Sequence, residues 1–141
     1  MTTLGQRLKA SSEAFNKKMC YTPEQVEARE ARRVETLRKS LMRVLEKAKT
    51  DIRKAIDAGK PAHEVCSRVP EREACYRLLK ERFGWLKYDP RAEPVLRPLW
   101  EAFVLWTLSE QLEVSLQPYT CGEGLLARQY VRIRVQPESV H

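Results

Sequence analysis

The sequence predicts a mainly helical α+β fold with a long basic helix near its N-terminal end and a small antiparallel β-hairpin at its C-terminal end. Three patterns predict this fold. Apolar residues recur at helical spacing between Pro23 and Ala58, an apolar helix is indicated over 98–113, and apolar and polar side chains alternate over 125–136. We expect residues 1–60 to form a basic helical arm and residues 61–141 a compact helical core with the hairpin. The 141 residues suit one folded unit.

The long helix has clear start and stop signals. Thr22 suits the N-cap position, and Gln25 lies three residues later, which predicts a capping box. From Val34 onward the apolar spacing is three or four residues, so one stripe faces a partner, whereas the part before it is expected to project into solvent. Gly59 followed by Pro61 predicts the end of the helix. Residues 1–20 are weakly amphipathic and predict a short helix or an arm that orders on binding.

The middle of the chain predicts two further helices. Residues 61–69 are expected to form a turn with one short helical piece, and Pro70 suits the first position of a helix that runs to Phe83. The region 85–97 is expected to be a connector, because its recurring prolines resist regular helix. The helix over 98–113 has apolar side chains around most of its circumference, so we expect it to be the central core helix.

Two strands are predicted at the end of the chain, over 114–119 and 125–136, joined by a glycine-containing loop. In the second strand Leu125 and the other apolar residues share one face, and arginine and tyrosine side chains share the other. A lone hairpin is marginally stable in water, so its apolar face is expected to pack on the tryptophan-rich helix.

Several classes of function are excluded by what the sequence lacks. It has no signal-peptide h-region and no apolar run long enough to span a membrane, so we expect a cytoplasmic protein with no membrane partner. The spacing of Cys20, Cys66, Cys75 and Cys121 matches no zinc pattern, so we expect neutral thiols, no metal and no cofactor. His63 near Cys66 has no group to orient it, and we expect no enzymatic activity.

The formal charge of the chain is concentrated in its first part. Residues 1–60 hold 15 Lys and Arg against 8 Asp and Glu, whereas residues 61–141 hold 11 of each, so the net +7 lies before residue 61. Such a basic region suits an acidic protein, nucleic acid or an anionic surface. The candidate partner-binding residues are cations of the long helix and the polar face of the last strand: Arg29, Arg32, Arg33, Arg38, Lys39, Arg43, Arg128, Tyr130, Arg132 and Arg134.

Both candidate surfaces have alternative interpretations. The acidic residues interleaved along the helix also suit a solvated surface with ion pairs, and the arginine–tyrosine face suits a protein interface, base stacking or a solvated sheet face. If the last strand is an exposed edge, a partner strand could add to it. A winged helix is excluded, because the connector is too long and acids occupy the helix that would enter the groove.

Three function classes follow: a protein-binding regulator, a nucleic-acid-binding module that uses the basic helix, and a helical adaptor or oligomerisation protein. A coiled-coil seam from Val34 would support the third, but Asp51 interrupts it.

Four features of the sequence together resemble a known class of protein. They are the basic helix at 23–58, the strand Gln129–Val135, Asn16 as the single asparagine, and a composition rich in Leu, Arg, Glu and Val. With this length, the chain resembles the small inhibitors that thermophilic phages make against bacterial RNA polymerase. The resemblance implies a non-enzymatic regulator that contacts the polymerase β flap and the C-terminal domain of the σ factor. It also implies that the protein acts in the host cytoplasm and inhibits or redirects transcription.

Overall fold

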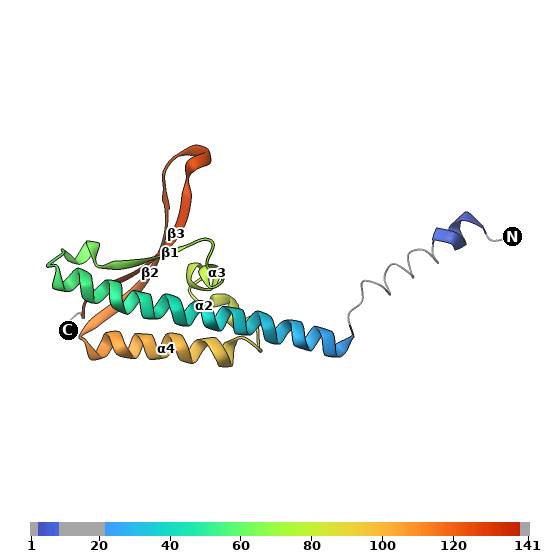
Figure 1. Ribbon diagram of the computed structural model, residues 1–141, viewed down its shortest axis with the longest axis horizontal. Coiled ribbons are helices and arrows are strands. Elements are labelled where there is room, and N and C mark those ends of the chain that lie inside the picture. The colour runs from blue at the N-terminus through green and yellow to red at the C-terminus, as the bar shows by residue number, and fades with distance from the viewer. Residues whose placement is uncertain (1–2, 9–21, 139–141) are drawn as a thin grey trace. The chain divides into compact units, whose positions relative to one another are not determined.

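The computed structural model describes residues 3–8 and 22–138, and its described part is an α+β fold as predicted (Figure 1). The chain divides into two compact units, Met1–Arg33 and Val34–His141, and the boundary lies within helix α2 (Pro23–Asp57). Residues 4–8 are helical, as expected for part of the segment 1–20. The rest of that prediction, over residues 1–2 and 9–20, lies outside the described residues.

Helix α2 confirms the predicted long helix and its signals. The Gln25 N–H donates to Thr22 Oγ1 at 3.2 Å and the Thr22 N–H donates to Gln25 Oε1 at 2.9 Å, so the capping box forms. After the helix, Gly59 adopts φ 71°, and the Lys60 N–H donates to the Ala55 carbonyl at 3.0 Å. The buried apolar stripe starts where predicted and consists of Val34, Leu41, Val44, Leu45, Ala48, Ile52 and Ala55.

The sheet has three antiparallel strands in the order β1-β3-β2: β1 (Cys66–Pro70), β2 (Leu112–Cys121) and β3 (Arg128–Pro137). Strands β2 and β3 confirm the predicted hairpin, and η3 (Gly124–Leu126) lies in their connection. Strand β1 was not predicted, and the turn expected over 61–69 is wrong from Cys66 onward. Only η1 (Ala62–Glu64) is helical there.

Strand β1 was not predicted because one of its buried positions holds a serine, so its sequence does not show the alternation of apolar and polar residues that is typical of a strand. Its inward residues are Ser67 and Val69, and Ser67 Oγ donates to Asp51 Oδ2 of α2 at 2.8 Å. Pro70 was expected to start a helix but ends this strand instead. Pro70 is the last residue of an edge strand, a position at which the missing N–H of proline is tolerated.

Two helix boundaries also differ from prediction. Helix α3 covers only Tyr76–Lys80, because Arg82 and Phe83 adopt left-handed φ values of 52° and 63° and the chain then forms η2 (Gly84–Tyr88). Helix α4 (Glu93–Ser109) begins inside the expected connector, because Pro94 lies in its first turn, where no intrahelical N–H is needed.

The core lies between the helices and one face of the sheet. Inward residues of the three strands form one buried cluster with residues of α2, α3 and α4. In α4 only Leu96, Phe103 and Thr107 are buried, whereas Leu105 and Leu108 are exposed by 66% and 43%. The prediction that this helix is central is therefore wrong: it packs through one side. Figure 1 shows the β2–β3 hairpin extending away from the helices of this unit.

Candidate functional site

One face of the sheet packs against the helices. The side chains on its other face are exposed or half-buried, and we call this face the open face. Strand β3 is central, so each of its outward side chains has cross-strand neighbours: Arg132 lies opposite Arg68 of β1 and Gln117 of β2, and Tyr130 lies opposite Tyr119. The outward side chains are all exposed or half-buried, and none is fully buried: Cys66, Arg68 and Pro70 of β1, Glu113, Ser115, Gln117, Tyr119 and Cys121 of β2, and Arg128, Tyr130, Arg132, Arg134 and Gln136 of β3. No helix therefore covers this face.

Planar side chains contact one another across the middle of this open face. The rings of Tyr119 and Tyr130 stack with centroids 5.5 Å apart and planes inclined by 24°. The Arg132 guanidinium lies over the Tyr119 ring, with Cζ 4.1 Å from its centroid. Arg134 Nη1 donates to Gln117 Oε1 at 2.9 Å. Direct and diagonal cross-strand neighbours make such contacts, so the register itself assembles this cluster.

The open face carries arginines that have no carboxylate partner in the part of the chain that the structure describes. Arg68, Arg128, Arg132 and Arg134 form no ion pair with any described residue. Arg68 and Arg132 are direct cross-strand neighbours, and like charges in that position destabilise a sheet. The acid on this face is Glu113 at one end, which accepts from Gln136 Nε2 at 3.4 Å.

Three donor atoms in this cluster are covered by protein and donate to no acceptor among the described residues: Arg132 Nε, Arg134 Nε and Tyr119 Oη. Leaving a covered donor unpaired costs free energy. A ligand that supplies acceptor oxygens would remove this cost after small rotations of the side chains.

The tip of the hairpin exposes two leucines. Leu125 is fully exposed and Leu126 is exposed by 84%. Leu125 was expected on the buried face of the last strand; that prediction is wrong, because the residue lies in η3, before β3 begins. The connection needs glycine at Gly122, whose φ is 92° and whose added Cβ would lie 3.1 Å from the Leu126 carbonyl oxygen. Hydrogen bonds from the Leu126 N–H to the Glu123 carbonyl at 3.3 Å and from the Ala127 N–H to the Gly124 carbonyl at 3.2 Å hold the turn that displays the leucines.

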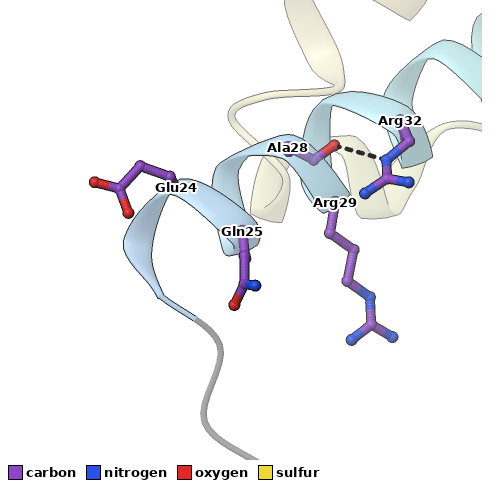
Figure 2. Close-up of a pocket in the computed structure, with 5 residues that line it drawn as sticks. All are labelled: Glu24, Gln25, Ala28, Arg29 and Arg32. Carbon is purple, nitrogen blue, oxygen red and sulfur yellow. Dashed lines mark hydrogen bonds between the residues drawn. The ribbon is translucent and has the colours of Figure 1, made fainter.

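The first turns of α2 carry an open hollow lined by Glu24, Gln25, Ala28, Arg29 and Arg32 (Figure 2). Figure 2 shows Arg29 extending away from the helix, and Arg32 Nε donating to the Ala28 carbonyl at 3.4 Å. All five lining side chains come from this one helix and are exposed. The hollow is thus a helix surface that could take part in docking.

Most other candidate cations of α2 have acidic partners. Arg33 pairs with Glu30 at 2.9 Å, Arg38 Nε donates to Glu35 Oε2 at 2.8 Å, and Arg43 Nη2 lies 2.6 Å from Glu73 Oε2. The hydrogen bond from Arg38 lowers the pKa of Glu35. Lys39 is exposed. The positive charge of this part of the helix is therefore largely balanced by its own neighbours.

Further observations concern the sheet edges, the buried thiol, metal ions and membrane spans. The idea of strand addition to the last strand is wrong, because β3 is central and the sheet edges are β1 and β2. The buried Cys75 is no reactive thiol, because burial raises its pKa to about 11. Among residues 3–8 and 22–138, no cluster of three His, Cys, Asp or Glu could hold a metal ion, and no helix has the length and apolar character to cross a membrane.

Sequence reasoning missed Arg68, Gln117 and Tyr119 as members of the open face. Arg68 was missed because β1 was not predicted, and the other two because their place depends on the register between β2 and β3. Comparison of the chain with protein-family models, curated proteins and solved structures found no match.

Proposed function

We propose that the protein is a non-enzymatic regulator that binds bacterial RNA polymerase holoenzyme, at the β flap and the σ C-terminal domain, and inhibits or redirects transcription. The observation that carries this proposal is the tip of the hairpin, where Leu125 and Leu126 are held in solvent by a glycine-dependent turn. Exposed leucines in a defined turn are suited to bury in a partner, because removing apolar surface from water is favourable.

The occupant proposed for this tip is a small apolar element such as the tip of the polymerase flap. A hairpin can insert its leucines beside such an element while its strands keep their own hydrogen bonds. The net charge of +7 would speed the encounter with acidic polymerase surfaces, and Arg29 and Arg32 are exposed cations suited to that role. The positive charge of the basic arm thus raises the rate of association, and burial of the leucines raises the affinity.

The protein would regulate transcription by occupying a site on the polymerase, without catalysing a reaction. A chain bound at the junction between flap and σ would displace the σ domain and weaken promoters that depend on it. Promoters that do not need that contact would be spared. This mechanism uses no nucleophile, metal or cofactor from the chain.

The test measures binding of the full chain to polymerase core enzyme and holoenzyme at increasing salt. Leu125→Ser with Leu126→Ser should weaken holoenzyme binding at least tenfold, because the apolar anchor is lost. The matched control is Leu105→Ser with Leu108→Ser, which removes two exposed leucines from α4. Wild-type binding should change with σ and resist salt.

The variants also need a folding control and a functional readout. Both pairs of leucines are exposed, so melting temperatures should stay close to wild type. Transcription in vitro from σ-dependent promoters should fall with the wild-type chain and recover with the hairpin variant. Equal loss of binding in both leucine variants, or a wild-type chain that ignores polymerase, would contradict the proposal.

A further inference from the structure

We propose that the open face of the sheet binds single-stranded nucleic acid, a function beyond polymerase docking and independent of it. Three features of this face support the proposal: arginines that form no ion pair with a described residue, planar side chains in contact, and covered donors without an acceptor among the described residues. In this arrangement bases stack at Tyr130 and Arg132, and phosphates pair with Arg68, Arg128 and Arg134.

Charge is the first argument. Four arginines share this face without a carboxylate partner among the described residues, and Arg68 lies directly opposite Arg132. Placing like charges as neighbours destabilises the folded sheet unless an anion lies between them. A phosphodiester chain supplies repeated anionic oxygens, and arginine binds phosphate with its planar fork of donors.

The planar cluster is the second argument. Tyr130, Tyr119 and the Arg132 guanidinium contact one another in succession, with 5.5 Å between the ring centroids and 4.1 Å between Arg132 Cζ and the Tyr119 ring centroid. Unpaired bases stack on aromatic rings and on guanidinium planes, and single-strand binders combine such platforms with a positive surface. Bases inside a duplex are stacked on each other and cannot use this platform, so the ligand is single-stranded.

A hollow at the edge of the platform is the third argument. It has a volume of about 280 Å³ and lies beside Tyr130, lined also by Arg72 and Arg128. Its remaining lining residues are Pro70, Glu71, Ala127 and Gln129. The volume is near the lower end of the range of small-molecule pockets, which suits one flipped base at the end of the stack.

The covered donors favour the same ligand. Arg132 Nε, Arg134 Nε and Tyr119 Oη donate to no described residue. Phosphate and base oxygens are acceptors, and a rotation of each side chain would bring its donor to them. An acidic protein surface would also supply carboxylates, but it would not use a stacked tyrosine pair so directly.

The experiment measures fluorescence anisotropy of labelled oligonucleotides titrated with the full chain. The probes are single-stranded DNA and single-stranded RNA of one mixed sequence and the corresponding DNA duplex. Single strands should bind at least tenfold more tightly than the duplex. The logarithm of affinity for single strands should fall with the logarithm of salt with a slope of about −2, as three phosphate contacts predict. The DNA and RNA arms decide which polymer is preferred.

The decisive comparison is between two charge-reversal variants, one on the open face and one on α2, that change the net charge equally. Arg132→Glu with Arg134→Glu should weaken single-strand binding at least tenfold. Its matched control, Arg29→Glu with Arg32→Glu on α2, has the same net charge and should keep most of the affinity. Tyr130→Leu should lose about tenfold, the loss of one stacked base, with little change in salt slope.

A second charge variant guards against misfolding. If Arg132→Glu with Arg134→Glu fails to give a wild-type melting curve, Arg68→Glu with Arg128→Glu decides, because both of those side chains are exposed. That variant should also weaken single-strand binding at least fivefold. Leu125→Ser with Leu126→Ser should leave oligonucleotide binding unchanged, so failure of this inference and failure of polymerase docking are separable.

Three outcomes would overturn the inference. The first is equal loss of affinity in the α2 control and the sheet variants, which would indicate net charge alone. The second is a wild-type chain that shows no preference for single strands, whether it binds the duplex equally well or binds no oligonucleotide. The third is that the wild-type chain binds no oligonucleotide and the sheet variants lose polymerase binding. This result would mean that the open face is a protein interface.

Discussion

Helix α2 and the open face of the sheet are both rich in arginine, but they use it differently. Along α2, acids three or four residues from the cations form ion pairs, as Glu30 does with Arg33 and Glu35 with Arg38. On the sheet, alternation places Arg132 and Arg134 side by side, and their cross-strand neighbours are neutral or basic. The comparison teaches that the net charge of a segment does not locate the charge that is free to bind a ligand.

The largest expected effect separates the two faces of β3. Ile133 is fully buried, so Ile133→Ala should lower the free energy of unfolding by about 2–5 kcal/mol. Arg132→Ala, on the next residue, should lower it by less than about 1 kcal/mol, because it removes one cation–π contact and relieves repulsion from Arg68. Urea denaturation measures both values. Equal losses would mean that the open face stabilises the fold and is not reserved for a ligand.

Cysteine reactivity compares the same regions without changing charge. Cys121 is exposed on the open face, whereas Cys75 is buried and its N–H donates to Ser40 Oγ of α2 at 3.2 Å. Because burial raises the pKa of Cys75 to about 11, its thiolate is scarce at neutral pH. In a Cys20→Ser, Cys66→Ser background, Cys121 should react with a thiol reagent at least about a hundredfold faster than Cys75.

The denatured chain provides the control for this measurement, since both thiols should then react at similar rates. Similar rates in the folded chain would contradict the packing of α2 over Cys75. Bound single-stranded oligonucleotide should slow Cys121 if the ligand covers that end of the face.

A smaller effect tests whether α2 cations stabilise the fold. The Arg53 guanidinium lies over the Trp106 ring, with Cζ 5.3 Å from its centroid, and Lys49 Nζ lies 5.7 Å from it. Arg53→Ala should lower stability by about 0.5–1 kcal/mol in the wild type and by much less in a Trp106→Leu background. Thermal or urea unfolding of the double-mutant cycle measures the coupling. A coupling of zero would leave Arg53 available for a partner.

The smallest effect concerns acid. Burial raises the pKa of Asp51, but hydrogen bonds from Lys47 and Ser67 lower it more, so the net shift is downward. The folded pKa is thus below the unfolded value, and the stabilisation is present above about pH 4 and lost as pH falls through the folded pKa. Asp51→Asn should reduce stability at neutral pH by less than about 1 kcal/mol and flatten its decline in acid. Chemical denaturation across this pH range provides the check, and an unchanged decline would contradict it.

Local signals predicted the parts of the fold that depend on neighbouring residues. The capping box at Thr22, the stripe from Val34 and the stop at Gly59 all lie within one helix, and all are confirmed. Strand β1 could not be predicted in the same way, because Ser67 is tolerated in the core only through Asp51, sixteen positions away. The sequence also does not indicate which side of α4 packs against the core, because apolar residues occur all around this helix.

The sequence alone predicts an α+β chain with a long capped basic helix and a terminal hairpin, and it places the formal charge before residue 61. Which arginines have no acidic partner among the described residues depends on how the chain folds. Ion pairs balance much of α2, whereas strand register gathers Arg68, Arg132 and Arg134 on one face of the half whose net charge is zero. The physical reason is that helical neighbours are set by spacing along the chain, whereas neighbours in a sheet are set by pairing between distant segments.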